Sequence, residues 1–245
     1  MENLFKKQLP IGIFDSGIGG LNVLYRAKTI LPNENFIYLG DNLNAPYGNK
    51  SILELKSLAK SNIETLCKLN SKVICVACNT LSTSIYEYLK DISPVPIIPT
   101  VPVNISKGSD IATLIATPNT IKSDYVKENF KNVYKLPLPF LAGEIEKYIF
   151  TPSKINIQHD MRGLNFDTNL IILGCTHYSF IKKSIKTITG VKVVDTLDHT
   201  VNLLAQTLKN NNLLNENGGK ITFVGDNKEY NLSVFNSCLG ANWVN

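Results

Sequence analysis

Short β-branched runs alternate along this chain with longer stretches of helical spacing. Parallel strands need a crossover between them, usually a helix, so this alternation is the pattern of a parallel sheet covered by helices. It predicts an α/β fold, and the apolar runs predict nine strands. These strands are Ile11–Phe14, Phe36–Leu39, Val73–Ala77, Ile97–Thr100, Thr113–Ala116, Val133–Leu136, Leu170–Leu173, Val191–Asp195 and Ile221–Val224.

Several stretches between the strands predict helices. Ser51 and Glu54 have the spacing of a capping box, and apolar residues over Ile52–Leu69 follow a period of 3.6 residues, which indicates one long helix. Ser179 is expected to cap a second helix, and a third begins within Val201–Leu208.

The proline-rich stretch Pro94–Pro102 divides the chain, because it cannot continue a helix. We interpret it as a crossover between two α/β lobes. The second lobe is expected to hold residues 101–200. The first lobe is expected to hold residues 1–100 and 201–245, because the chain makes one more strand after the second lobe.

Composition favours a globular protein of the cytoplasm. The 245 residues are 44% hydrophobic and 18% charged, which is enough for a full core. Apolar runs such as Val95–Val103 are about half a bilayer span and contain prolines, so we expect no membrane segment. The glycine turn begins by Gly17, which leaves little room for an export signal. Five cysteines spread through a chain of this size indicate reduced thiols.

The net charge of +5 does not by itself indicate a nucleic-acid partner. All of the 25 basic residues except Arg26 and Arg162 are lysines, and they are scattered along the chain. Few side chains can therefore offer a bidentate fork to phosphate or guanine. We expect a lysine-rich surface and a small-molecule ligand, with no nucleic-acid or membrane partner.

Two short segments mirror each other. Ala77–Thr80 follows the apolar run that ends at Val76, Gly174–His177 follows the run that ends at Leu173, and each contains one cysteine, Cys78 or Cys175. Ligands of open α/β sheets bind beyond the carboxyl ends of the strands, so two such thiols are placed to face one substrate from opposite sides. That arrangement suits the movement of a proton across a stereocentre.

The segment Phe14–Gly20 is a glycine-rich turn with more than one interpretation. The dinucleotide-binding pattern needs glycine where Asn22 stands, and the triphosphate-binding pattern needs a Gly-Lys-Ser/Thr sequence that this segment lacks. Two interpretations remain. Either the turn presents backbone N–H groups to an anion, or Asp15 caps the helix that starts near Leu21.

Cys75 and Cys78 have the spacing of a redox or zinc motif, for which Cys175 and His177 could supply further ligands. Cys75 lies inside the expected strand, however, roughly 10 Å from Cys78 and on the opposite face. It is expected to point into the core, which disfavours both a zinc site and a dithiol.

These segments together resemble the signature segments of the glutamate racemase family, in that family's order and spacing. The resemblance spans nearly the whole chain, and it rests on Ile11–Gly20, Pro46–Gly48, Ala77–Thr80, Ala116–Ser123, Gly174–Tyr178 and Val224–Asp226.

The resemblance implies a cofactor-independent isomerase with two pseudosymmetric α/β lobes and an active site in the cleft between them. Such an enzyme interconverts L- and D-glutamate and supplies D-glutamate for peptidoglycan synthesis, and members of the family often form homodimers. No metal is implied.

The resemblance also implies roles for individual residues. Cys78 takes the α-proton from D-glutamate and Cys175 takes it from L-glutamate, while Asp15 and His177 assist one thiol each and Glu146 aligns with a third assisting group. The residues implied to bind the substrate are Ser16, Pro46, Tyr47, Gly48, Asn79, Thr80, Thr117, Thr120 and Thr176.

Two thiols suit this reaction, because one can remove the proton while the other delivers a new one to the opposite face. Ionising an ordinary thiol at pH 7 costs about 2 kcal/mol, which is small beside the barrier lowering of about 8–23 kcal/mol that enzymes achieve. Most of that lowering must therefore come from positioning and from hydrogen-bond donors to the substrate carboxylate.

The chain departs from the family pattern at Leu81, Pro99, Leu138 and Ser179, which bear on pocket shape and on hinge geometry. Two alternatives on the same fold stay open: a racemase of another acidic amino acid such as aspartate, and an inactive binding or regulatory paralogue. The glycine turn, taken alone, also permits a third alternative, a nucleotide-binding regulator.

Overall fold

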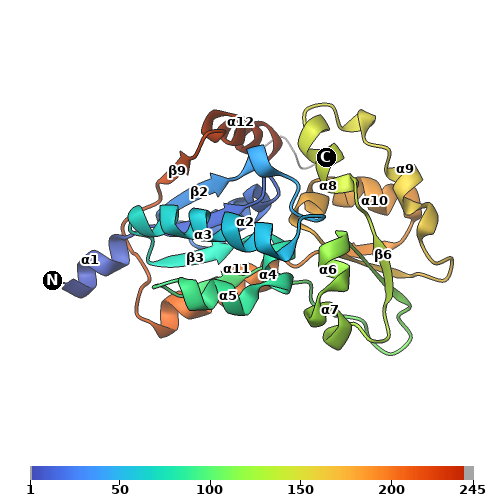
Figure 1. Cartoon of the computed structure of the whole chain (residues 1–245), viewed down its shortest axis with the longest axis horizontal. Coiled ribbons are helices and arrows are strands. Elements are labelled where there is room, and N and C mark those ends of the chain that lie inside the picture. Colours follow the sequence, from blue (N-terminus) through green and yellow to red (C-terminus); the bar gives the residue numbers. More distant parts are fainter. Residues whose placement is uncertain (1, 240–245) are drawn as a thin grey trace.

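The computed structural model describes residues 2–239, so the last six residues of the expected first lobe lie outside this range. The chain forms a five-stranded sheet and a four-stranded sheet, which lie side by side with helices around each (Figure 1). Both are fully parallel among the described strands. The α/β class predicted from the sequence is confirmed, and all nine predicted strands are present within one or two residues of their expected ends.

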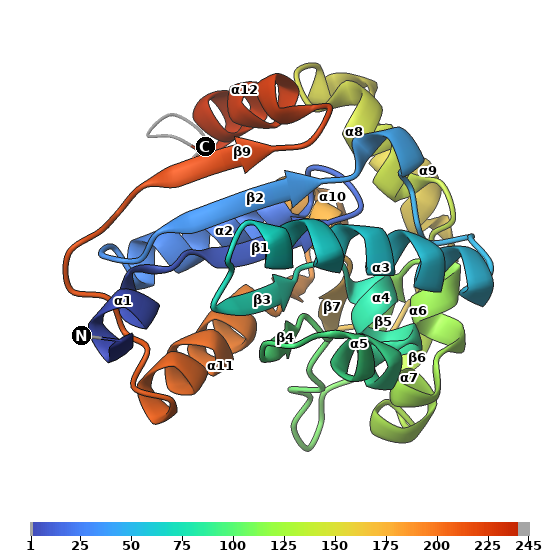
Figure 2. The same cartoon turned by 60° about the vertical axis from the view of Figure 1, so that its left-hand side comes forward.

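The first sheet has the order β4-β3-β1-β2-β9. Its last strand comes from the C-terminal part of the chain, and β9 pairs with β2 at the outer edge of the sheet (Figure 2). The strands are β1 (Ile11–Asp15), β2 (Phe36–Gly40), β3 (Val73–Val76), β4 (Ile97–Pro99) and β9 (Ile221–Val224).

The second sheet repeats the topology of the first. Its order is β6-β5-β7-β8, so in each sheet the first strand of the unit lies between the second and the third, and the fourth lies outside the third. This shared order is the pseudosymmetry of the molecule. The strands are β5 (Ala112–Ala116), β6 (Tyr134–Pro137), β7 (Leu170–Gly174) and β8 (Lys192–Val194).

The helices of the first unit cover its sheet. The predicted capping box is present at α3 (Ile52–Lys68), where Ser51 and Glu54 satisfy each other's backbone N–H groups. The other helices of this unit are α1 (Glu2–Gln8), α2 (Gly20–Ile30), α4 (Asn79–Ser84) and α5 (Tyr86–Ile92).

The helices of the second unit are shorter, and one of them does not begin where the sequence predicts. Ser179 caps no helix, because it lies inside the 3₁₀ helix η4 (Thr176–Ile181), and α10 (Lys182–Thr189) begins only after Ile181. The remaining helices of this unit are α6 (Pro118–Lys122), α7 (Asp124–Asn129), α8 (Leu141–Tyr148) and α9 (Ile157–Asp160).

The C-terminal part returns to the first sheet. Helix α11 (Leu197–Asn210) begins four residues before its predicted start, and it packs against α2 and β4. Helix α12 (Lys228–Cys238) packs against β9 and β2. One apolar cluster runs through both halves and joins β1 residues to the interior of α8, η4 and α11. No helix in residues 2–239 is long and apolar enough to cross a bilayer.

Candidate active site

The two mirrored cysteines follow the third strand of each unit. Cys78 lies two residues after β3 and directly before α4, and Cys175 lies between β7 and η4. Both side chains are nearly enclosed, with Cys78 5% and Cys175 8% exposed. Because β3 and β7 occupy equivalent places in the two sheets, the fold brings equivalent strand ends to the junction of the halves.

Each of these strand ends faces the end of the first strand in the other unit. Thr80 Oγ1, after β3, lies 3.0 Å from Thr117 Oγ1, after β5. Asn22 Nδ2, in α2 after β1, donates to the Thr176 carbonyl, after β7, over 3.1 Å. The polar residues expected around the two thiols are therefore shared between the halves.

The glycine turn binds carboxylates of the protein itself. Asp15 Oδ2 accepts from the backbone N–H groups of Gly20 (3.0 Å) and Gly17 (3.3 Å), so Asp15 acts as a cap at the start of α2. Ile18 N–H donates to Glu146 Oε2 of α8 over 3.1 Å. Both interpretations of the turn thus hold in part: Asp15 caps the helix, and one N–H group faces an anion, which is a carboxylate of the other half.

The turn needs glycine because it touches the other half closely. A Cβ atom at position 17 would lie 2.7 Å from Glu146 Cδ, and one at position 19 would lie 2.8 Å from the backbone nitrogen of His177. Real Cβ atoms do not approach so closely. A side chain at position 17 would displace the Glu146 carboxylate, and one at position 19 would meet the backbone of the other half.

Cys175, His177 and Glu146 form a chain of contacts. Cys175 Sγ lies 3.9 Å from His177 Nδ1, and His177 Nε2 lies 2.7 Å from Glu146 Oε2. Burial lowers the pKa of His177, but the hydrogen bonds to Cys175 and Glu146 outweigh burial, so this pKa lies well above its ordinary value. A protonated ring can donate from Nε2 to the carboxylate and from Nδ1 to a sulfur that has lost its proton.

Cys78 lies in a different environment. Burial, followed by the charge of Asp15, raises the pKa of the Cys78 thiol to about 12, and a negative charge on Cys175 also raises it. The hydroxyl of Ser16 acts in the opposite direction. Cys78 thus lies beside a carboxylate, whereas Cys175 lies beside an imidazole.

Asp15 is the buried acid of this site. Burial raises the pKa of Asp15, and His177 and the N–H groups of Gly20 and Gly17 offset only part of this rise. Asp15 Oδ1 is buried and has no hydrogen-bond partner within residues 2–239.

The remaining predicted substrate residues fall into two groups. Ser16, Thr80, Thr117, Thr120 and Thr176 are buried at strand ends of the junction, and Thr117 donates to Thr120 over 3.1 Å. The hydroxyl of Tyr47, by contrast, donates to Asp41 and accepts from Asn62 over 3.3 Å. The Asn79 amide donates to the Thr100 carbonyl over 3.0 Å.

The segment Pro46–Gly48 contacts the second half at Gly48. Asn119 N–H donates to the Gly48 carbonyl over 3.0 Å, and a Cβ atom at position 48 would lie 2.6 Å from Thr117 Cβ. Pro46 lines a cavity of about 440 Å³ whose wall also contains Glu146 and His177. This cavity reaches the His177–Glu146 pair from the surface.

Sequence reasoning missed two asparagines at this junction. Asn22 bridges the Gly19 and Thr176 carbonyls, and Asn42 Nδ2 donates to Glu146 Oε1. Asn42 lies in the same post-strand loop as Pro46–Gly48, which is the signal that could have indicated it. Cys75 behaves as expected and is fully buried within β3.

Comparison with known proteins agrees with this geometry. A glutamate racemase of Clostridium perfringens is 36% identical over 252 residues, which cover 94% of this chain and 92% of that protein. The chain belongs to the glutamate racemase family. A second glutamate racemase, of Clostridium novyi, is 35% identical over 254 residues and covers 95% of this chain and 98% of that protein. No family model matches the sequence.

Solved structures of glutamate racemases have the same fold. The enzyme of Francisella tularensis in complex with D-glutamate superposes with a TM-score of 0.81 at 30% identity over 94% of both chains. The Thermus thermophilus enzyme in complex with β-chloro-D-alanine gives a TM-score of 0.78 at 30% identity, over 96% of this chain and 92% of that one. This chain is therefore an isomerase, as the family resemblance predicted.

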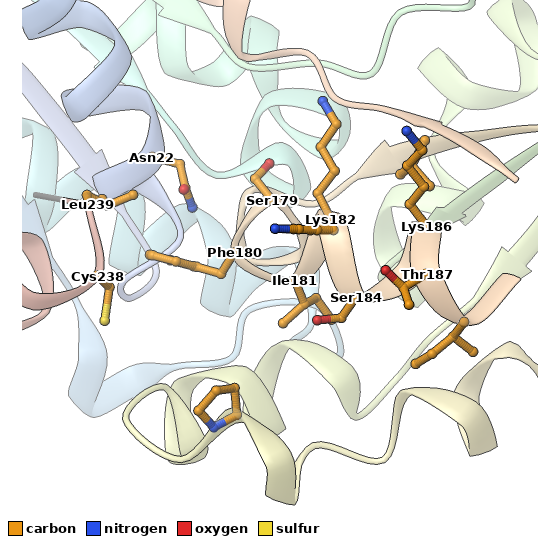
Figure 3. A pocket seen from close by; sticks show the side chains of 14 residues that line it. Asn22, Ser179, Phe180, Ile181, Lys182, Ser184, Lys186, Thr187, Cys238 and Leu239 are labelled. Carbon is orange, nitrogen blue, oxygen red and sulfur yellow. The ribbon is translucent and has the colours of Figure 1, made fainter. Parts of the chain in front are cut away.

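This member of the glutamate racemase family also contains a larger cavity, of about 1020 Å³. Residues of η4 and α10 line it, together with Asn22 of α2 and the end of α12 (Figure 3). Neither Cys78 nor Cys175 is among the described residues in its wall.

Proposed function

We propose that this chain racemises glutamate by a two-base mechanism in which Cys78 and Cys175 act on opposite faces of the α-carbon. The observation that carries the proposal is the placement of two buried thiols at equivalent strand ends of the two sheets, beside residues that bond directly across the junction of the halves. Starting from L-glutamate, Cys175 removes the α-proton and Cys78 delivers a proton to the opposite face. From D-glutamate the two roles are exchanged.

Assisting groups flank each sulfur in this proposal. Asp15 serves Cys78, and His177 with Glu146 serves Cys175, because these are the titratable neighbours on each side. A negatively charged Asp15 also offers a partner for the substrate ammonium group. These side chains hold and move protons, and the buried hydroxyls between them stabilise charge on the substrate carboxylate.

The raised pKa of Cys78 makes the ionisation of this thiol more costly than the sequence alone predicts. With a pKa of about 12, ionising this thiol at pH 7 costs about 7 kcal/mol instead of the 2 kcal/mol of an ordinary thiol. An ammonium group beside the sulfur would reduce this cost. Cys78 is therefore suited to hold its proton until the substrate is in place.

Ser16, Asn79, Thr80, Thr117, Thr120 and Thr176, with the backbone of Pro46, Tyr47 and Gly48, are the proposed substrate-binding groups. Family membership supports a role in supplying D-glutamate for peptidoglycan synthesis, in the cytoplasm. The proposed lobes are 1–100 with 201–245, and 101–200, in line with the pairing of β9 with β2. The reaction proposed needs no cofactor.

Circular dichroism of glutamate and aspartate solutions tests the function. We expect either glutamate enantiomer to lose its signal, and we expect Cys78→Ala and Cys175→Ala to slow this loss at least about 1000-fold. Cys67→Ala is the matched control, because Cys67 is a partly exposed thiol of α3 away from the junction.

The alternatives give other results. Faster racemisation of aspartate would reject glutamate as the substrate. No turnover of either amino acid, and no exchange of the α-proton, would favour a binding or regulatory protein. Normal activity in either site variant would refute the two-thiol mechanism.

A further inference from the structure

Glu146 is held from both halves of the molecule. Its Oε2 atom accepts from the Ile18 N–H group over 3.1 Å and lies 2.7 Å from His177 Nε2. Its Oε1 atom accepts from Asn42 Nδ2, in the loop after β2. The side chain of Asn42 therefore fixes the rotation of the carboxylate, and the carboxylate in turn fixes the ring that faces Cys175.

Asn42 is itself fixed by helix α12. Asn231 Nδ2 donates to Asn42 Oδ1 over 3.0 Å, and Asn231 is fully buried. Because a carboxylate only accepts hydrogen bonds, the NH₂ group of Asn42 must face Glu146, which leaves Oδ1 for Asn231. Both ends of this amide are thus occupied and its orientation is determined.

Both asparagine side chains lie close to the backbone of Gly40, at the end of β2. A Cβ atom at Gly40 would lie 2.7 Å from Asn231 Nδ2 and 3.0 Å from Asn42 Oδ1. The same helix holds Glu146 at a second point, since Tyr230 Oη donates to its carbonyl over 2.8 Å. Helix α12 is therefore joined to the His177–Glu146 pair by side chains that the proposed chemistry does not use.

We propose that Asn42 is a positioning residue for proton transfer at Cys175, acting through Glu146 and His177 and fixed in place by Asn231. This inference rests on the proposed function. Asn42 contacts neither sulfur in the described hydrogen bonds, so its effect passes through the orientation of the imidazole.

Two substitutions separate hydrogen bonding from packing. Asn42→Asp keeps the size and still accepts from Asn231, but it cannot donate to Glu146 when ionised and adds a negative charge beside it. Asn42→Ala removes the donor without adding charge. We expect kcat for glutamate to fall about tenfold in Asn42→Ala and about 100-fold in Asn42→Asp, with KM changed less than about threefold.

If Asn42 acted only by packing, kcat would fall further in Asn42→Ala than in Asn42→Asp, because alanine leaves a void and aspartate does not. Asn44→Ala is the matched control from the same loop, since Asn44 is exposed and bonds only to Asp41 among the described side chains. We expect its kcat to stay within twofold of the unchanged protein. Asn231→Asp, which loses the donor to Asn42, should lower kcat about threefold.

A readout that does not depend on activity keeps the two proposals apart. The chain has three histidines, so ¹⁵N-histidine labelling resolves the ring signals of His177 from those of His159 and His199. We expect both Asn42 variants to shift the His177 signals only. If these signals stay unchanged, or if both variants keep the kcat of Asn44→Ala, the positioning role is wrong. If the unchanged protein does not racemise glutamate, the proposed function fails, and the histidine signals still test the positioning.

Discussion

Cys78 and Cys175 follow equivalent strands, yet their titratable neighbours differ. Asp15 lies near Cys78, whereas His177 Nδ1 lies 3.9 Å from Cys175 Sγ. A carboxylate opposes a second negative charge beside it, and an imidazolium ion stabilises one. At the residue scale, the two sulfurs therefore differ in the groups that assist them, although the strands that carry them are equivalent.

Asp15→Asn tests how much the buried carboxyl group of Asp15 lowers the stability of the folded protein. Burial holds the pKa of Asp15 in the folded protein above 3.8, its ordinary value, so the folded state retains this proton more strongly than the unfolded chain. The free energy of unfolding therefore falls as the pH rises from 3.8 through the raised folded pKa, and the loss remains at higher pH.

Asparagine does not ionise, so Asp15→Asn removes this loss of stability at higher pH. We expect urea titrations to show that Asp15→Asn gains stability over the unchanged protein as the pH rises, by about 1.4 kcal/mol for each unit of pKa rise. The kcat for glutamate should fall about 100-fold. An identical pH dependence of stability in the two proteins would contradict the burial of a carboxylate at this position.

At the scale of elements, the glycine turn between β1 and α2 touches the second half closely, at Glu146 and His177. Gly19 has ordinary helical backbone angles (φ −54°, ψ −41°), so alanine is strained there only by its neighbours in the other half. Gly143 of α8 is the matched control, because a Cβ atom there would meet only Pro46 Cγ, at 3.9 Å.

We expect Gly19→Ala to lower the free energy of unfolding by about 1–3 kcal/mol and to lower kcat/KM at least tenfold. Gly143→Ala should raise stability by about 0.5–1 kcal/mol and leave kcat/KM unchanged. Urea unfolding and racemisation assays of both variants measure this. Equal activity of the two variants would show that the turn does not set the site geometry.

The sequence predicted the elements better than their contacts. Strands such as β1 and β7 are buried apolar runs, and α3 begins at a capping box, so local patterns are enough to find them. The prediction that Ser179 caps a helix is wrong, because η4 delays the start of α10 and no local cap signal shows this delay. The role of Asn42 depends on Glu146, 104 residues away, so only the docking of the two halves reveals it.

At the scale of the whole molecule, two units of the same topology enclose the site between them. Cys78 and Cys175 are only 5% and 8% exposed, so the proposed reaction requires the halves to separate before glutamate can reach both thiols. Ile18, Asn22 and Asn42 of the first half donate to Glu146 and Thr176 of the second. In the proposed reaction, the approach of the two halves after substrate binding would form these hydrogen bonds near Cys175 and exclude water from the site in the same step.

The central claim is that two sulfurs act on opposite faces of one carbon. It is tested most directly by brief incubation of L-glutamate with the protein in deuterated water, separation of the enantiomers, and mass spectrometry of each. The account predicts deuterium at Cα of the newly formed D-glutamate and almost none in the recovered L-glutamate, with the reverse result from D-glutamate. Equal labelling of the recovered substrate and the product at early times would mean that one base serves both faces, and would contradict the account.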